Sequence, residues 1–533
     1  MNGLFTGATI LDSPTTASDI LLRTFASGGV DTCFANPGTS ELDLVKSLGR
    51  SEIRSILCLF EGVVAGAADG YGRVRNAPAL TLTHLGPGFA GAIQNLHNAK
   101  RASTPVINLI GQNPVDHSDR YDVGLNSDIA SLAKPVSHQF VTIDDARAVS
   151  EFALEALKAA ASEGGQVITL AVPSDVQAAP LAAETPIAAS PAVPGRAAVD
   201  FGAVEQAARL IRDGGSVVLL LGGSGVEADA QIAAARIAAA FPNVRLLLET
   251  FSARLPRGVD LPPIGKLPYF SEAALAALAG ASHVILAGAK EPVAYFNTPG
   301  LPDELAPAGS IRVLASPAAD VEDALAKLVQ QLGADGAELP QRAHGIAEMP
   351  GRDTPLLADL IGPILAASLV EGSIVTTESP SAGPGFAKAQ INAPRHLALG
   401  LTGGAIGLGL PLALGAAVGA PGTPVYALQS DGSAVYTISA LWTMAREQLP
   451  ITIILVANRR YEILNVELLL RGLTEIPERI RSLTDLGSPA MNWVALANGF
   501  GVEARSVSNC GELMDALAGR ENARAPLLIE ANI

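Results

Sequence analysis

The sequence predicts an α/β protein of three doubly wound domains, each built on a parallel sheet. Short apolar runs suited to strands alternate with helical patterns along most of the chain, which is typical of parallel sheets covered by helices. A Pro/Ala-rich linker near residues 177–198 and a second linker around residues 335–354 divide this pattern. At 533 residues the chain is long enough for about three domains. We therefore expect domains over residues 1–180, 198–335 and 352–533.

The first segment predicts five strands and the helices between them. A helix over residues 17–27 precedes a strand over 32–35, and the turn at 36–40 is suited to begin a helix that runs to residue 48. A buried strand over 55–60 leads into a helix that starts at Glu61. Strands over 79–84, 106–110 and 166–172 complete the expected sheet.

The middle and last segments repeat the alternation. A strand over 217–221 is followed by Gly222-Gly223-Ser224-Gly225, and further strands are expected at 244–248, 283–286 and 311–314. No complete Gly-x-Gly-x-x-Gly is present, so we expect a Rossmann-like domain whose turn need not bind a nucleotide. In the last segment, strands at 373–377, 425–429, 451–456 and 527–530 predict a sheet of similar design to the first.

Composition excludes several classes of protein. Half of the residues (49%) are apolar and 17% are charged, as in a well-buried globular enzyme. The net charge of −16 argues against binding to nucleic acid or to anionic membrane surfaces. The almost wholly apolar stretch 403–420 is rich in glycine and is expected to be a buried helix rather than a membrane span.

The N-terminus and the cysteines suggest a cytoplasmic location. No basic segment precedes an apolar core at the N-terminus, so no signal peptide is predicted. Cys33, Cys58 and Cys510 have no metal-ligand spacing and are expected to be buried thiols in a reducing compartment.

Asp431 and Asn458 are candidate metal ligands. The strand over 425–429 ends in an Asp-Gly turn, a helix is expected over 438–448, and the strand over 451–456 stops before Asn458. This βαβ unit delivers both side chains to the carboxyl edge of one sheet, where ligands bind in such folds. A carboxylate, an amide oxygen and a backbone carbonyl form a set of oxygen ligands suited to Mg²⁺. Turn chemistry and strand termination explain the same residues without a metal, and spacing alone leaves both interpretations open.

Glu61 is the second candidate. It follows the apolar run Ile56-Leu57-Cys58-Leu59-Phe60, and a carboxylate in such surroundings suits proton transfer. The alternative is an ordinary acidic residue at a helix N-terminus, favoured by the helix dipole.

Together these stretches resemble the thiamine-diphosphate enzymes. Phe60-Glu61 followed by Ala67-Ala68-Asp69-Gly70-Tyr71-Gly72-Arg73 is similar to the glutamate signature of that superfamily. Ser430-Asp431-Gly432-Ser433 with Asn458 is similar to its metal–diphosphate motif, from which Ser430 and Ala457 depart without touching a ligand position. The resemblance covers the whole chain and is closest to benzoylformate decarboxylases and acetolactate-synthase-like proteins.

The resemblance implies a role for each matching residue. Asp431 and Asn458 would bind Mg²⁺ through their side chains and Arg460 through its backbone carbonyl. Glu61 would hydrogen-bond the pyrimidine ring of the cofactor and activate it. Gly432, Ser433 and Tyr461 would contact the diphosphate. The Gly404 carbonyl would accept a hydrogen bond from the pyrimidine amine, and the bulky side chain of Ile406 would hold the cofactor in a bent shape. Glu378 matches an acidic turn that lies near the cofactor in the family.

The same resemblance points to the substrate site. Asn36-Pro37-Gly38-Thr39 is similar to a carboxylate-binding loop of benzoylformate decarboxylases, and His84 matches one of their active-site histidines. Leu464 would line the pocket. The stretch 292–300 lacks the second histidine of those enzymes. Gly62 follows Glu61 where flavin-dependent acetolactate synthases have glutamine, and their Arg-rich flavin loop is unrecognisable, which argues against FAD.

The expected function is therefore decarboxylation of an aromatic or branched 2-oxo acid, through an enamine intermediate, with thiamine diphosphate and Mg²⁺. A carboligase of the acetolactate-synthase type, which traps the same intermediate with a second carbonyl compound, is the alternative. A cofactor-binding subunit without activity is a third, against which the retained Glu61, Asp431 and Asn458 argue. The resemblance also implies a homodimer or homotetramer with active sites between chains.

Overall fold

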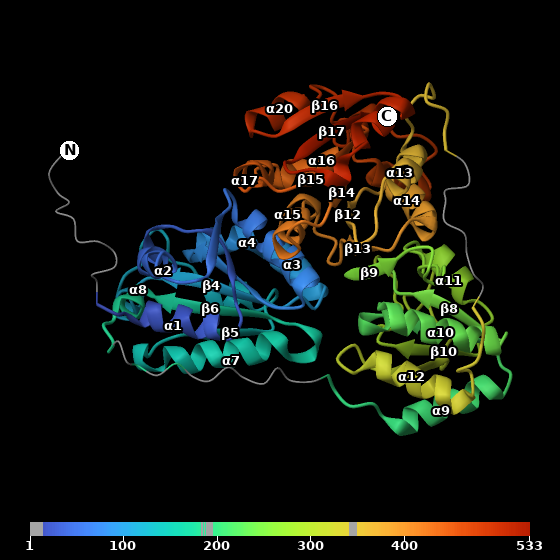
Figure 1. Cartoon of the computed structure of the whole chain (residues 1–533), viewed down its shortest axis with the longest axis horizontal. Coiled ribbons are helices and arrows are strands. Elements are labelled where there is room, and N and C mark those ends of the chain that lie inside the picture. The colour runs from blue at the N-terminus through green and yellow to red at the C-terminus, as the bar shows by residue number, and fades with distance from the viewer. Residues whose placement is uncertain (1–13, 183–184, 186, 188–195, 340–348) are drawn as a thin grey trace.

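The computed structural model describes residues 14–182, 185, 187, 196–339 and 349–533. It contains three sheets with helices around them, one for each third of the chain (Figure 1). The first sheet has six parallel strands in the order β2-β1-β3-β4-β6-β5. Their bounds are β1 Thr32–Asn36, β2 Arg54–Leu57, β3 Ala79–His84, β4 Val106–Gln112, β5 Gln139–Thr142 and β6 Val167–Pro173.

Helices join and cover these strands. The turn after β1 forms the short 3₁₀ helix η2 (Thr39–Glu41). The α-helices of this domain are α1 Ala17–Ser27, α2 Leu42–Leu48, α3 Glu61–Arg75, α4 Leu85–Arg101, α5 Val115–Arg120, α6 Ile129–Ala133, α7 Val149–Ala161 and α8 Ser174–Ala178.

The predicted strand over 55–60 is shorter and less buried than expected. Strand β2 ends at Leu57, and its first residues Arg54 and Ser55 are exposed because β2 lies at the edge of the sheet. The chain then turns through Cys58–Phe60, which sets Glu61 at the first position of α3.

The middle domain has a four-stranded parallel sheet in the order β11-β10-β7-β8. Its strands are β7 Val217–Leu221, β8 Val244–Leu248, β10 His283–Ala287 and β11 Ile311–Ala315. Its helices are α9 Phe201–Arg212, η5 Gly223–Val226, α10 Ala228–Ala240, α11 Ser271–Leu278 and α12 Val321–Leu332.

The third sheet has seven strands in the order β16-β17-β15-β14-β12-β13-β9. Six are parallel: β12 Ile374–Glu378, β13 His396–Gly400, β14 Val425–Ser430, β15 Ile451–Ala457, β16 Glu503–Val507 and β17 Leu527–Asn532. Strand β9 (Arg254–Arg257) comes from the middle segment and pairs antiparallel with β13. The helices are α13 Ala358–Ala367, α14 Gly383–Ala389, α15 Gly409–Gly419, α16 Asp431–Ala434, α17 Ala440–Arg446, α18 Glu462–Leu470, α19 Glu478–Arg481, α20 Trp493–Gly499 and α21 Cys510–Leu517.

The first and third sheets share one design, as the sequence predicts. Reading β13-β12-β14-β15-β17-β16 against β2-β1-β3-β4-β6-β5 gives the same order of connection for all six strands. In this correspondence α3 matches α15, since each lies between the second and third strands of its domain.

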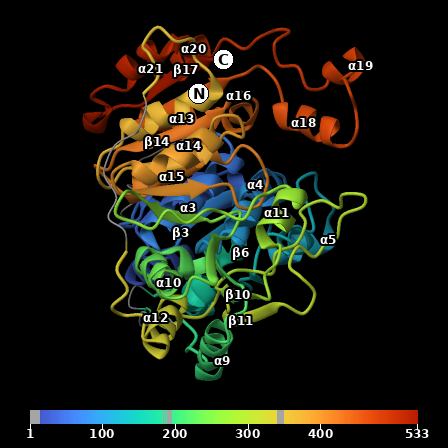
Figure 2. The same ribbon diagram turned by 90° about the vertical axis from the view of Figure 1, so that its right-hand side faces the viewer.

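Helices α3 and α15 pack closely against each other, side by side (Figures 1 and 2). Glycine makes the close approach possible: a Cβ at Gly70 would overlap the Leu412 carbonyl, and one at Gly415 would overlap the Ala67 carbonyl. The expected helix over 403–420 begins only at Gly409, because the stretch before it forms a loop. Among the described residues, no helix is both long and apolar enough to cross a membrane.

The segment from Asp69 to Arg73 ties this interface to the rest of the chain. Arg73 forms a buried ion pair with Asp69 at 2.6 Å. The same guanidinium donates to the carbonyls of Gly400 at 2.6 Å and Ala253 at 3.0 Å. Its charge is thus paired and its remaining donors are used, as burial of an arginine requires. All three cysteines are buried and free, and burial raises the pKa of Cys33 and Cys58 to about 12.

In the middle domain the side-chain carboxylate of Glu249 approaches the glycine-rich turn that follows β7. Glu249, which follows β8, accepts a hydrogen bond from Gly223 N–H at 3.3 Å, and a Cβ on Gly222 would lie 2.6 Å from its Oε2. The close approach of Glu249 therefore explains why position 222 is glycine, without a bound nucleotide. Burial raises the pKa of Glu249 to about 7.

This raised pKa predicts a change of stability with pH. Between the ordinary pKa of 4.5 and about 7, the unfolded chain has released the Glu249 proton while the folded protein still holds it. We therefore expect wild-type stability, relative to Glu249→Gln, to fall by about 1–3 kcal/mol as pH rises across this window. Urea unfolding of both proteins at pH 5 and pH 7 measures it. Parallel pH dependence in the two proteins would contradict the prediction.

Candidate active site

Glu61 and His84 are neighbours at the carboxyl edge of the first sheet. Glu61 begins α3, and His84 ends β3 and passes directly into α4. Gly88 of α4 lies between them: a Cβ there would be 2.8 Å from Glu61 Oε1 and 3.2 Å from His84 Cβ. Leu85, the residue after His84, has a positive φ of 44°, a strained backbone for a leucine and a common mark of functional sites.

The turn after β1 holds the other face of His84. Glu41 Oε2 lies 2.9 Å from His84 Nδ1, and Ser40 Oγ lies 3.0 Å from the same atom. Thr39, the predicted carboxylate ligand, is on the same turn with an exposed side chain. Ser40 and Glu41 were not predicted as site residues. A sequence feature that could have indicated Glu41 is its position three residues after Gly38. This is the spacing of a capping box, in which Glu41 accepts a hydrogen bond from Gly38 N–H.

Asp431 and Asn458 lie at the carboxyl edge of the third sheet, at the ends of the paired strands β14 and β15. The Asp-Gly pair is not the predicted tight turn: Asp431 is the first residue of α16, and the longer helix expected over 438–448 is α17, Ala440–Arg446. Asp431 accepts from the N–H groups of Gly432 and Arg459, each at 2.8 Å. The hydrogen bond from Arg459 N–H holds residues 458–459 against the Asp431 carboxylate. Arg459 has a positive φ of 56°, which turns the chain there.

Helix α4 joins the Glu61 region to the loop before α15. Asn95 Nδ2 donates to Gly62 O at 2.8 Å and lies 3.4 Å from Gly407 O. Gln94 Nε2 donates to the Ile406 carbonyl at 2.5 Å, and Asn98 Nδ2 to the Ala405 carbonyl at 2.8 Å. Glu61 and the loop over residues 404–407 therefore lie at the same end of the α3–α15 pair. The three amide side chains of α4 that hold this region together were not predicted from the sequence.

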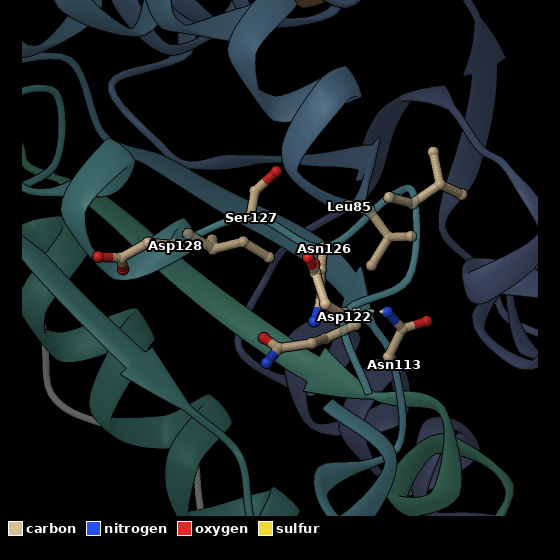
Figure 3. A pocket seen from close by; sticks show the side chains of 9 residues that line it. Leu85, Asn113, Asp122, Asn126, Ser127 and Asp128 are labelled. Atoms are coloured by element: carbon tan, nitrogen blue, oxygen red, sulfur yellow. Dashed lines mark hydrogen bonds between the residues drawn. The ribbon is translucent and has the colours of Figure 1, made fainter. Parts of the chain in front are cut away.

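A cavity of about 370 Å³ opens beside Leu85 at the same edge (Figure 3). Carboxylates and amides dominate its lining, which is Leu85, Gln112, Asn113, Asp122, Leu125, Asn126, Ser127, Asp128 and Ile129. Asn113 donates to Asn126 across it at 3.3 Å. The cavity borders the residue after His84, and neither His84 nor Glu61 is part of its lining.

Comparison with known proteins explains this arrangement. The family described as thiamine pyrophosphate enzyme, N-terminal TPP binding domain, matches residues 15–132, and the corresponding C-terminal TPP binding domain matches residues 385–531. A Mycobacterium tuberculosis protein named "Putative acetolactate synthase large subunit IlvX" is 42% identical over 96% of this chain and 97% of its own. The chain belongs to the thiamine-diphosphate-dependent enzymes.

Two decarboxylases are also similar to it. Benzoylformate decarboxylase of Pseudomonas aeruginosa is 28% identical over 94% of this chain and 96% of its own. The solved structure of a thiamine-diphosphate-dependent 4-hydroxybenzoylformate decarboxylase from Rhodococcus jostii superposes with a TM-score of 0.83 at 25% identity, covering 97% of this chain and 98% of that one. The chain is thus a thiamine-diphosphate-dependent enzyme of the decarboxylase and acetolactate-synthase-like type, with the predicted fold.

The residues around Asp431 fit a magnesium–diphosphate site. Asp431 is 1% exposed, and burial raises its pKa while the N–H groups of Arg459 and Gly432 act against that rise. A bound cation would compensate the charge of such a buried carboxylate. One carboxylate with neutral amide and carbonyl oxygens is a donor set that suits Mg²⁺. The Arg460 side chain pairs with Glu462 at 2.6 Å, so a metal contact from Arg460 would use its backbone carbonyl.

The predicted diphosphate contacts gather around α16. The Tyr461 ring packs against Gly432, where a Cβ would lie 2.7 Å from the ring. Ser433 Oγ donates to the Ser430 carbonyl at 3.2 Å and accepts from Gln429 Nε2 at 2.5 Å. These contacts place Gly432, Ser433 and Tyr461 together beside Asp431, and their roles toward the cofactor stay predictions.

Glu378 acquires a specific position. Its buried carboxylate accepts from Gly407 N–H at 2.6 Å, from Gly409 N–H at 2.7 Å and from Gln429 Nε2 at 3.1 Å. Burial raises its pKa, and these donors oppose the rise. Glu378 therefore holds the loop that carries Gly404 and Ile406, two residues predicted to contact the cofactor, and its own contact with the cofactor stays a prediction.

Glu378→Gln should weaken thiamine diphosphate binding by about 10–100-fold, because an amide leaves one buried glycine N–H without an acceptor, at about 1–3 kcal/mol. Calorimetric titration with thiamine diphosphate and Mg²⁺ measures the change. Glu371→Gln, an exposed acid that precedes the same strand, is the control and should bind like the wild type. Equal affinity in Glu378→Gln and wild type would show that the loop does not depend on this carboxylate.

Two further parts of the chain were linked to the substrate site from the sequence, Leu464 and the stretch 292–300. Leu464 is 48% exposed on α18, and α18 and α19 project from the third domain (Figure 2). Residues 292–296 of the stretch 292–300, where the second histidine is absent, line a cavity of about 840 Å³ whose lining comes from all three domains and includes Arg73, Tyr269 and Gly404. Tyr295 of this stretch stacks on Tyr269 with ring centroids 5.4 Å apart.

Proposed function

We propose that this enzyme catalyses the non-oxidative decarboxylation of a 2-oxo acid with thiamine diphosphate and Mg²⁺. The observation that supports this reaction is the position of His84. It stands beside Glu61, on the edge that also carries the Asn36–Thr39 loop, with 22% of its side chain exposed. An acid–base group next to the ring-activating glutamate is what turnover of a 2-oxo acid to an aldehyde requires.

Each residue then has a defined task. Thiamine diphosphate, when bound, supplies an electron sink for the loss of CO₂. Asp431, Asn458 and the Arg460 carbonyl would hold Mg²⁺ and through it the diphosphate, and Gly432, Ser433 and Tyr461 would border that end. Glu61 would hold a proton at a ring nitrogen. Thr39 would donate to the substrate carboxylate, and His84 Nε2 would exchange a proton with the substrate.

A carboligase of the acetolactate-synthase type is the second candidate, and one observation favours it. The relative that is 42% identical carries an acetolactate synthase name. Such an enzyme releases CO₂ as well, but it joins the remaining fragment to a second carbonyl compound.

A panel of 2-oxo acids with purified protein, thiamine diphosphate and Mg²⁺ tests both candidates. We expect CO₂ release with an aldehyde as the product. An acyloin as the main product would replace the decarboxylase by the carboligase. No CO₂ from any member of the panel, in a protein that binds the cofactor, would overturn both.

We also propose that a second copy of the chain completes the site. Apolar side chains stay exposed around both carboxyl edges: Leu42, Leu59, Val435, Tyr436, Ile463 and Leu464 are between 37% and 52% exposed. Side chains of this size grouped around a reaction centre favour a covered interface. Light scattering should give a dimer or tetramer, whereas a monomeric protein with full activity would contradict this arrangement.

A further inference from the structure

Within the part of the chain that the structure describes, the His84 ring forms hydrogen bonds through Nδ1 and none through Nε2. Nδ1 lies 2.9 Å from Glu41 Oε2, and a Cβ at Gly38 would overlap the ring from the same side. Glu41 accepts and cannot donate when ionised, so its bond to His84 places the proton on Nδ1. The neutral ring then has its lone pair on Nε2, which is free of this contact.

Glu41 is built into the fold as an acceptor. Its side chain is 0% exposed. Oε2 also accepts from Gly38 N–H at 2.8 Å, and Oε1 accepts from Ser40 Oγ at 2.7 Å. Among the described residues it makes no salt bridge with a lysine or arginine. The two neutral donors and the imidazole together occupy both carboxylate oxygens, which fixes the orientation of Glu41 toward His84.

The neighbouring elements lock this geometry. Gly111 at the end of β4 leaves the space that Glu41 fills, since a Cβ there would overlap Oε1. Gln177 Nε2 donates to the Ser40 carbonyl at 2.9 Å and to the Val172 carbonyl at 2.7 Å, which ties the turn to β6. The turn after β1 therefore cannot shift without breaking contacts to two other strands.

We propose that Glu41 is the positioning residue of His84, a role that rests on the proposed function. It fixes the Nδ1–H tautomer, directs Nε2 to the substrate and stabilises the imidazolium. The imidazolium donates its Nε2 proton to the substrate carbonyl oxygen as the carbonyl carbon is attacked, and the neutral ring takes a proton back from that oxygen when the aldehyde carbonyl forms, while Nδ1–H stays on the ring. The proton that replaces CO₂ on the carbon comes from solvent water.

The pH profile of kcat/KM tests this role. His84→Ala identifies the limb of the wild-type profile that belongs to His84. In Glu41→Gln that limb should move to lower pH, because a neighbouring carboxylate favours the charged imidazole. Ser40→Ala is the matched control: it removes the other contact to Nδ1 but keeps the carboxylate, so the limb should stay in place.

The other charges that face His84 are kept in all these variants. The nearest is Glu61 across Gly88, while Asp122 and Asp128 line the cavity beside Leu85, which does not include His84. A lowered kcat in Glu41→Gln with an unmoved limb would overturn the proposal, since it would leave only a structural role.

A second measurement does not depend on turnover or on the variant's folding. In wild-type protein with ¹⁵N-labelled histidine, assigned with His84→Asn, ring spectra at high pH should show Nδ1–H for His84. An Nε2–H tautomer would overturn the proposal even in an active enzyme. If instead no 2-oxo acid is turned over while Nδ1–H is found, the proposed function fails and the positioning geometry stands.

Discussion

Glu61→Gln should lower kcat by about 100- to 10,000-fold, the usual contribution of a proton-transferring side chain. An amide at this position still fills the space against Gly88 and Gly91 but cannot hold or release the proton that activates the cofactor ring. Steady-state CO₂ release at saturating thiamine diphosphate and Mg²⁺ measures the loss. Cofactor affinity should change far less, because the diphosphate end is bound elsewhere.

The control for Glu61 is Glu151→Gln, an exposed acid near the start of α7, which should leave the rate unchanged. If Glu61→Gln turned over substrate at the wild-type rate, Glu61 would not be the residue that activates the cofactor ring. A parallel loss of thermal stability would instead indicate that the substitution damages α3, so unfolding midpoints belong in the same experiment.

Asp431→Asn should weaken cofactor binding in the presence of Mg²⁺ by about 10- to 150-fold. The substitution removes the one carboxylate of the predicted ligand set, and a charge-assisted contact to a buried group contributes about 1.5–3 kcal/mol beyond any neutral one. It also sets an amide against the N–H groups of Gly432 and Arg459, which both need an acceptor. Calorimetry with and without Mg²⁺ separates the metal-dependent part of the loss.

Glu462→Gln serves as the control for Asp431. It removes a nearby carboxylate that pairs with the Arg460 side chain and accepts from Asn465 Nδ2, and it should bind the cofactor like the wild type. Tight, Mg²⁺-dependent binding by Asp431→Asn would show that the metal is held elsewhere.

The two variants together test where each half of the site comes from. If Glu61 of one chain faces Asp431 of another, a mixed dimer of the two inactive variants contains one fully wild-type site. Co-expression with two tags, followed by tandem purification, should then recover up to about half of the wild-type activity per dimer. Mixed dimers as inactive as their parents would place both residues of a working site in the same chain.

The sequence predicted most of the parallel strands closely, and the reason lies in their burial. Strands such as β3 and β7 have the predicted bounds, because nearly all of their residues are buried and they are bounded by turn residues. The strands that were missed, β5, β9, β13 and β16, lie at or next to a sheet edge, although the edge strands β2, β8 and β11 were predicted. In β16 three of five residues are exposed, and β9 contains Pro256 and pairs with a distant part of the chain.

The same division applies to the site. Chain-local motifs were enough to single out Glu61, His84, Asp431 and Asn458, since each follows a strand and its chemistry is carried by its own side chain. The residues that orient them were not visible in this way. Glu41 contacts His84 across 43 positions, Glu378 contacts Gly407 across 29, and Asn95 lies against Gly407 across 312.

The sequence by itself therefore determined the fold class, the cofactor family and the candidate reacting groups. Only the tertiary structure decided how those groups are held: which nitrogen of His84 is tied, what pins the loop of Ile406, and how α3 and α15 approach. The physical reason is that strand, helix and motif signals are written in neighbouring residues, whereas a hydrogen bond between buried side chains joins positions that only the folded chain brings together.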